Sequence, residues 1–115
     1  MSHAPHNSTA VRPKAHAPVF AALGDPTRLS LVTKLSGGQP CSILQLTAGS
    51  RLTRQAITKH LRVLEEAGLV HSLRAGRESL FKLDPKPIHE ARQCLDAVSR
   101  QWDEALSRLK DLVEG

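Results

Sequence analysis

The segment "TRQAITKHLRVLEEAG" carries its apolar residues at helical spacing. Ile57, Leu61 and Leu64 follow one another at intervals of four and three residues, which places them on one face of a helix. Thr53 suits the N-cap because its hydroxyl can accept a backbone N–H, and Gly68 suits the end because it adopts left-handed conformations without strain. The pattern predicts an amphipathic helix between these two residues, with its apolar face buried.

Shorter apolar segments upstream predict three more helices. The segment "PVFAALG" predicts a short helix that begins at Pro18. A second helix follows Asp25, which can cap it, and ends at a pair of glycines beginning with Gly37. A third short helix begins near Ser42. We expect the inward side chains of the second and third helices to be Leu29, Val32, Leu35, Ile43 and Leu46.

The segment "LVHSLRAGRESLFKL" predicts a β-hairpin. Apolar and polar residues alternate loosely before the Ala-Gly turn signal and more clearly after it, where Phe81 and Leu83 fall on one side. Arg74 and Arg77 flank the turn, so the tip of the hairpin is expected to be basic.

The last apolar pattern lies in residues 85–115 and predicts one long helix. Its apolar residues recur alternately three and four positions apart, which is the heptad spacing of helices that pack along a seam. The seam is longer than a small domain needs for its own core. We therefore expect it to form a homodimer, with packing inside a single chain as the alternative. The expected interface residues are Ile88, Ala91, Leu95, Val98, Trp102, Ala105, Leu109 and Leu112.

The outward face of the 53–67 helix is unusual for a solvated surface. Basic and hydrogen-bonding side chains occupy its front half, and both acidic residues come at its end. The whole chain is also basic, with 16 Lys and Arg against 11 Asp and Glu and a formal net charge of +5. A basic excess suits a polyanionic partner, and the alternative is that these charges serve solubility alone. The front-half residues are Arg54, Gln55, Thr58, Lys59 and Arg62.

The bulk composition fits a single folded domain. The 115 residues suffice for one core, and 40% hydrophobic residues argue against overall disorder. Residues 1–16 are expected to be a flexible tail, 17–84 a domain and 85–115 the final helix. The tail lacks the apolar stretch of a secretory signal, and no apolar run could span a membrane, so we expect a cytoplasmic protein without a membrane partner. The tail histidines His3, His6 and His16 could catch a metal, but we expect no such role.

A short helix, a turn, a second helix and a basic hairpin follow the order of a winged helix-turn-helix, a mainly α fold with a small β-hairpin wing (α+β). In such modules the second helix lies in the DNA major groove, and its N-terminal residues reach the base edges. The expected partner is double-stranded operator DNA, and no motif indicates an enzyme. The alternative is a winged-helix module for protein association, which would not need these basic groups. The candidate DNA-binding residues are Thr53, Arg54, Gln55, Thr58, Lys59, His60, Arg62, Arg74 and Arg77.

The segments "VFAALGDPTRLSLVTKL", "TRQAITKHLRVLEEAGLV" and "GRESLFKL" resemble the ArsR/SmtB-type winged-helix repressors, from about Val19 to Leu83. The resemblance implies a homodimer that binds operator DNA near its own promoter, blocks transcription and is released by an inducer. It also implies that the 53–67 helix is the recognition helix and the hairpin the wing. Arg51 stands where the family has a glycine and Gly49 lies two residues earlier, so we expect a differently shaped turn.

The chain departs from the family at the sensor positions. Metal-sensing members carry a Cys-x-Cys pair before the recognition helix, whereas here those positions hold Ser42 and Leu44, and Cys41 lies one place earlier. The last helix has one histidine, His89, without a second at a suitable spacing. We therefore expect no metal site and no cofactor, and we leave the inducer unidentified. The alternative is a thiol or metalloid sensor that uses Cys41, at the expected start of the third helix, or Cys94.

Overall fold

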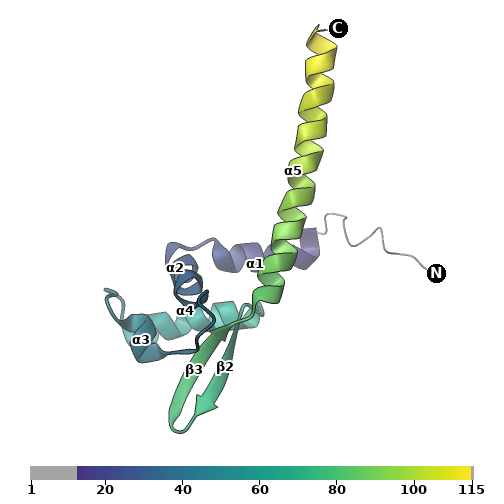
Figure 1. Ribbon diagram of the computed structural model, residues 1–115. Coiled ribbons are helices and arrows are strands. Elements are labelled where there is room, and N and C mark those ends of the chain that lie inside the picture. The colour runs from purple at the N-terminus through teal and green to yellow at the C-terminus, as the bar shows by residue number, and fades with distance from the viewer. Residues whose placement is uncertain (1–12, 115) are drawn as a thin grey trace, which may run out of the picture.

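The computed structural model describes residues 13–114, which form helices and a small antiparallel sheet (Figure 1). The mainly helical fold, with a hairpin and a long final helix, confirms the fold class expected from the sequence. In chain order the elements are α1 (Pro13–Leu23), α2 (Pro26–Leu35), β1 (Cys41–Ser42), α3 (Ile43–Thr47), α4 (Arg54–Glu66), β2 (Val70–Ala75), β3 (Glu78–Leu83) and α5 (Pro85–Glu114).

The core lies where the first four helices meet the base of the sheet and the first turns of α5. The expected buried face of α4 is confirmed, because Ile57, Leu61 and Leu64 are each at most 1% exposed. Leu69 and Val70, which connect α4 to the sheet, are 0% exposed. Burying one large aliphatic side chain is worth roughly 1.5–3 kcal/mol. The inward side of α4 therefore fixes the helix and leaves its outward side for other contacts.

Helices α2, α3 and α4 begin at side chains that cap their first N–H groups. The Asp25 carboxylate accepts the backbone N–H of Arg28 at 3.1 Å, and this bond holds the pKa of Asp25 below its ordinary value of 3.8. Ser42 and Gln45 cap α3 reciprocally, at 3.2 and 2.8 Å. Thr53 caps α4 by accepting a backbone N–H at 3.1 Å. The caps expected at Asp25 and Thr53 are thus confirmed.

Helix α1 begins at Pro13, so the expected start at Pro18 is wrong. Residues 13–16, which we assigned to the tail, are helical. Pro13 suits the first position because its fixed φ matches a helix and its missing N–H would have no partner there. Pro18 lies inside the helix, where it cannot donate to the Lys14 carbonyl. A proline inside a helix is rare, which is why the sequence pattern favoured the later start.

The inward side of α2 differs from expectation at one position. Leu29, which we expected to be buried, is 51% exposed, whereas Leu31 is 2% exposed. Val32 and Leu35 are buried as expected. On a helical projection Leu31 falls beside Leu35, while Leu29 falls on the far side of Val32. The three-residue spacing to Val32 therefore identified a residue at the edge of the apolar face and not at its centre.

Strands β2 and β3 form the expected hairpin, in which Ala75 lies opposite Glu78. The loop between them consists of Gly76 and Arg77. Gly76 has φ +63°, the left-handed conformation that short hairpin loops require at this position. The hairpin extends away from the helices, with its loop at the far end (Figure 1).

A third strand, β1, was not expected. It pairs antiparallel with β3, with Cys41 opposite Phe81 and Ser42 opposite Leu80. Cys41 therefore lies in a strand, one residue before the N-cap of α3, and our expectation that it starts a helix is wrong. Its thiol is half-buried and donates to the Gln39 carbonyl oxygen at 3.6 Å.

The end of α4 and the start of α5 meet at Leu69. Gly68, with φ +78°, ends α4 as expected, and its N–H donates to the Glu65 carbonyl at 3.0 Å. The Leu69 N–H donates back to the Leu64 carbonyl at 2.9 Å, and the Leu69 carbonyl accepts the Asp84 N–H at 2.8 Å. One residue thus links the C-terminus of α4 to the residue that precedes α5.

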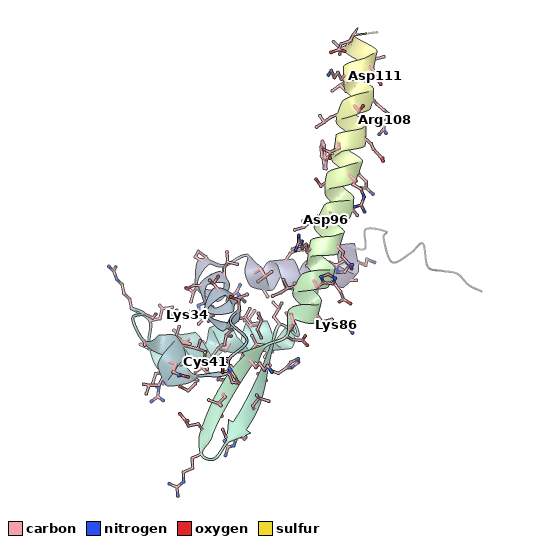
Figure 2. The ribbon with its side chains drawn as sticks, viewed as in Figure 1. Lys34, Cys41, Lys86, Asp96, Arg108 and Asp111 are labelled. Atoms are coloured by element: carbon pink, nitrogen blue, oxygen red, sulfur yellow. The ribbon has the colours of Figure 1, made fainter. Side chains whose placement is uncertain are left out.

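Helix α5 extends well past the rest of the molecule (Figure 1). Its first turns pack against α1 and bury Ala91, Cys94 and Ala97. Arg108 and Asp111 lie on the distal part that projects away from the other elements (Figure 2). The radius of gyration is 18.8 Å, compared with about 13 Å for a compact domain of this size. The difference reflects a helix whose second half projects beyond the other elements of residues 13–114.

Candidate nucleic-acid interface

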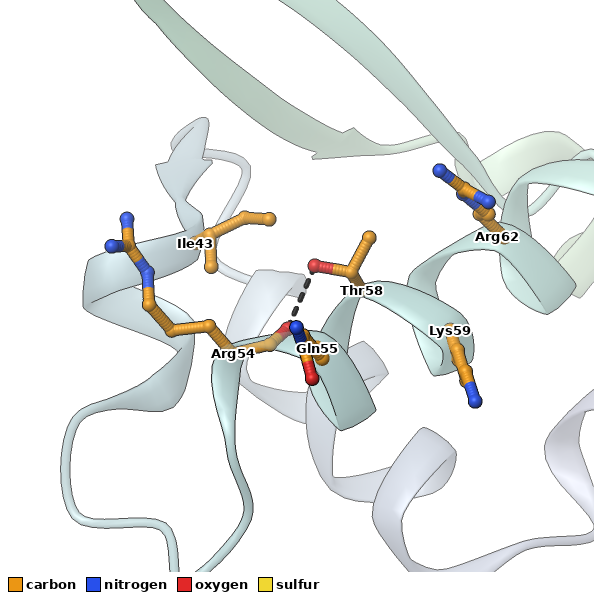
Figure 3. Close-up of a pocket in the computed structure, with 6 residues that line it drawn as sticks. All are labelled: Ile43, Arg54, Gln55, Thr58, Lys59 and Arg62. Atoms are coloured by element: carbon orange, nitrogen blue, oxygen red, sulfur yellow. Dashed lines mark hydrogen bonds between the residues drawn. The ribbon is translucent and has the colours of Figure 1, made fainter.

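The outward side of α4 carries a shallow hollow with a volume of about 440 Å³. Arg54, Gln55, Lys59 and Arg62 are exposed around it, and Thr58 is half-buried at its base (Figure 3). These five side chains were expected to bind DNA, and the fold brings them to one surface. We call this surface the α4 hollow. It is lined by Ile43, Arg54, Gln55, Thr58, Lys59 and Arg62.

The α4 hollow is positively charged. Within residues 13–114 the contacts at ion-pair distance are two histidine–aspartate contacts, so Arg54, Lys59 and Arg62 have no carboxylate partner among the described residues. Glu65, the first acid of α4, accepts a hydrogen bond from the Ser72 hydroxyl of β2 at 2.6 Å. Glu65 is therefore held by the first residues of the hairpin and does not neutralise the α4 hollow. The positive charge of the hollow remains available to a partner.

The two candidate threonines already bond to the α4 backbone. Thr58 Oγ1 donates to the Arg54 carbonyl at 2.7 Å, shown dashed in Figure 3. Thr53 Oγ1 accepts the N–H of Ala56 at 3.1 Å. Both hydroxyls thus have a structural role at the N-terminus of α4.

His60 lies on the other side of α4 from the hollow, beside the buried face, and DNA contact by this residue stays a prediction. Its Nδ1 is 3.3 Å from a guanidinium nitrogen of Arg28 and 3.8 Å from the Asp25 carboxylate. Arg28 in turn donates to the Ala22 carbonyl at 2.6 Å. His60 comes three residues after Ile57, at the flank of the buried face that meets α2. It connects α4 to the junction of α1 and α2.

The two expected wing cations are exposed on the hairpin. Arg74 lies on β2, and Arg77 occupies the loop between β2 and β3. The loop position makes Arg77 part of the outermost segment of the wing. A cation there can reach a phosphate or a minor groove beside the site that α4 faces.

The expected dimer-interface residues fall into two groups. Ala91 is 3% exposed and Ile88 is half-buried, because both pack against the core of their own chain. Val98 and Ala105 are half-buried on α5. The remaining apolar residues of the helix are 54–79% exposed, and we call them the α5 stripe. They are Leu95, Trp102, Leu106, Leu109, Leu112 and Val113.

The possible sensor residues lie apart in the fold. Cys94 is 7% exposed on α5, whereas Cys41 is half-buried in β1. Between residues 13 and 114, no three His, Cys, Asp or Glu side chains converge as a metal site. His16 is half-buried on α1, and His3 and His6 lie outside the described residues. None of the helices described is both long and apolar enough to cross a bilayer.

The helices α3 and α4 are joined by a turn in which Gly49 has φ +76° and Ser50 donates to the Thr47 carbonyl at 2.9 Å. Gly49, two positions before Arg51, thus supplies the left-handed residue of this turn. Helix, turn and a cationic second helix, followed by a hairpin with exposed arginines, define a winged helix-turn-helix DNA-binding protein.

Comparison with known proteins identifies the family. A family model described as a helix-turn-helix domain matches residues 23–72. The chain is 34% identical over 95 residues to the HTH-type transcriptional regulator Rv2034 of Mycobacterium tuberculosis, covering 83% of this chain and 85% of that protein. It is 32% identical over 88 residues to the HTH-type transcriptional repressor SmtB of the same species, covering 76% and 63%. The ArsR-like transcriptional regulator from Rhodococcus sp. RHA1 has a similar structure, with a TM-score of 0.79, 34% identity and coverage of 89% and 93%.

The chain therefore belongs to the ArsR/SmtB-type winged helix-turn-helix transcriptional regulators, and it is a DNA-binding regulator of transcription. The family expected from the sequence is confirmed.

Proposed function

We propose that the protein is a homodimeric repressor that binds operator DNA near its own promoter and is released by an inducer. Each chain contributes one recognition helix, α4, to a major groove and one wing to the adjacent backbone. The observation that carries this proposal is the α4 hollow, in which Arg54, Lys59 and Arg62 lack a carboxylate partner within the described part of the chain. Cations placed this way gain free energy by releasing the counterions of DNA phosphates.

The α5 stripe supports the homodimer. Apolar side chains gathered on one exposed face mark an association surface, because a monomer gains nothing from leaving them in water. Heptad spacing lets such a face pack against a second copy of the same helix. Ala91 belongs to the core of its own chain, so the dimer contact is proposed for the residues from Leu95 onward.

Release by an inducer is proposed from the family alone. A thiol or metalloid sensor at Cys41 or Cys94 is the variant of this proposal that the chain's own chemistry permits. Because Cys94 is 7% exposed, a reagent would reach Cys41 more readily.

The test measures, by fluorescence anisotropy at two salt concentrations, how tightly the protein binds the duplex upstream of its own gene. We expect tight binding that weakens steeply with salt, and much weaker binding to a scrambled duplex. A reporter driven by the same promoter should lose expression when the protein is present. Equal binding to both duplexes, or none at all, would favour a winged-helix module without an operator.

A further inference from the structure

Thr58 lines the α4 hollow, and its hydroxyl is turned back to the backbone of its own helix. The hydroxyl donates to the Arg54 carbonyl at 2.7 Å. Figure 3 shows the oxygen turned toward that carbonyl and the methyl carbon pointing away from the helix. Since the hydroxyl hydrogen is used within the helix, Thr58 has no free donor for a group that enters the hollow, and its methyl group is available for apolar contact.

Ile43 adds a second apolar side chain to the same hollow. It comes from the first residue of α3, is half-buried and packs partly against the core. The other lining residues are Arg54, Gln55, Lys59 and Arg62, all exposed and polar. The two half-buried residues of an otherwise cationic lining therefore both offer methyl groups, and we call them the floor of the hollow.

We propose that Thr58 and Ile43 recognise the C5-methyl group of a thymine in each operator half-site. This inference rests on the proposed DNA-binding function of the α4 hollow. Thymine is the base that displays a methyl group in the major groove of unmodified DNA, and apolar side chains contact it there. The surrounding cations hold the duplex through its phosphates, which brings the base edges to the floor of the hollow.

The experiment uses a duplex that the wild-type protein selects from a random-sequence pool. Each thymidine in turn is replaced by deoxyuridine, which removes the methyl and keeps the base pair. At one position per half-site we expect binding about fourfold weaker, the equivalent of burying one carbon group. Changing both half-sites should weaken binding about fifteenfold. The other thymidines should show no effect of this size.

Three variants assign the effect to the side chains. Thr58→Ser keeps the hydroxyl and its bond to Arg54 but lacks the methyl, so its preference for thymidine over deoxyuridine should fall below that of the wild type, with Ile43 left as the remaining contact. Thr58→Val keeps a methyl and lacks the hydroxyl, so it should still prefer thymidine. Ile43→Val should retain a reduced preference, and circular dichroism checks that each variant is folded.

Several outcomes overturn the inference. They are a selected duplex without thymidine in its conserved positions, no deoxyuridine effect at any position, a preference that is undiminished in Thr58→Ser, or its loss in Thr58→Val. If the wild-type protein selects no sequence from the pool, the proposed function fails and the inference fails with it. Selection without a deoxyuridine effect overturns the inference alone.

Discussion

Gln55 is exposed at the front of α4, where its amide can donate and accept at once. That pair of groups matches N7 and the exocyclic amine of adenine in the major groove. We predict that Gln55→Ala costs roughly 1–3 kcal/mol of binding free energy on the operator and little on random DNA. Binding to operator and scrambled duplexes across a salt series measures both. An equal loss on the two duplexes would show that Gln55 positions the protein and does not read sequence.

Arg77, in the loop of the wing, should act in the opposite way. Phosphate contacts raise affinity for all DNA by releasing counterions and carry little sequence information. Arg77→Ala is predicted to weaken binding to every duplex about equally and to reduce the salt dependence by about one phosphate contact. Arg108→Ala, on distal α5, is the matched control and should leave the salt dependence unchanged. A sequence-dependent loss in Arg77→Ala would contradict the prediction.

Asp84 makes the free energy of unfolding depend on pH. Its carboxylate bonds to His71 Nε2 at 2.9 Å and accepts the Lys86 N–H at 3.0 Å. These bonds, that of His71 first, hold the pKa of Asp84 below its ordinary 3.8. As the pH falls, the unfolded chain therefore takes up the proton before the folded chain does. The stabilisation is present above the ordinary pKa and is lost as the pH falls through the lowered pKa of the folded protein.

We predict that Asp84→Asn is less stable than the wild type at about pH 6 and that the difference is smaller at about pH 3. Urea unfolding at both values measures the difference. Asp96→Asn changes an exposed aspartate of α5 as the control. A difference between the wild type and Asp84→Asn that is independent of pH would contradict the prediction.

Among the elements, α4 was predictable because its signals are local. A cap at Thr53, a stop at Gly68 and a single apolar face lie within one segment of the sequence. Strand β1 was not predictable, because its two residues become a strand only by pairing with Phe81 and Leu80, far along the chain. A pattern within a segment cannot report a partner outside it.

The site divides in the same way. The outward cations of α4 follow from helical geometry and could be assigned from the sequence. The contribution of Ile43 could not, because it depends on how α3 packs beside α4. The contacts of His60 with Arg28 and Asp25 could not be predicted either, because these partners come from another part of the chain.

The end of α4 gives a prediction at the scale of an element. Gly68 has φ +78°, and a Cβ added there would meet nothing closer than Pro87 at 3.9 Å. Space is therefore available, and the cost of Gly68→Ala is backbone strain of roughly 1–2 kcal/mol. Gly37→Ala is the matched control, since it meets nothing within 4 Å and needs no left-handed backbone. Thermal unfolding should separate the two variants, and equal stabilities would contradict this account of the helix end.

At the scale of the whole molecule, the α5 stripe predicts how assembly responds to charge. Leu109→Asp would bury a carboxylate in the proposed dimer contact, which should cost several kcal/mol of association free energy. Ser107→Asp puts the same charge on the opposite face of α5 and should leave assembly intact. Sedimentation at micromolar concentration measures both, and operator affinity should fall with the dimer. A monomeric wild-type protein would end the homodimer proposal.

The exposed second half of α5 would make promoter occupancy depend steeply on the concentration of the protein. If the α5 stripe is covered only when two chains associate, the fraction of the protein that is dimeric and can bind the operator falls on dilution by mass action. Where most chains are single, halving the amount of protein would reduce occupied promoter about fourfold, since each complex needs two chains. A gene controlled in this way would switch on over a narrower range of protein level than one controlled by a monomer. The contact between two helices would then make the genetic response steeper than a monomer could.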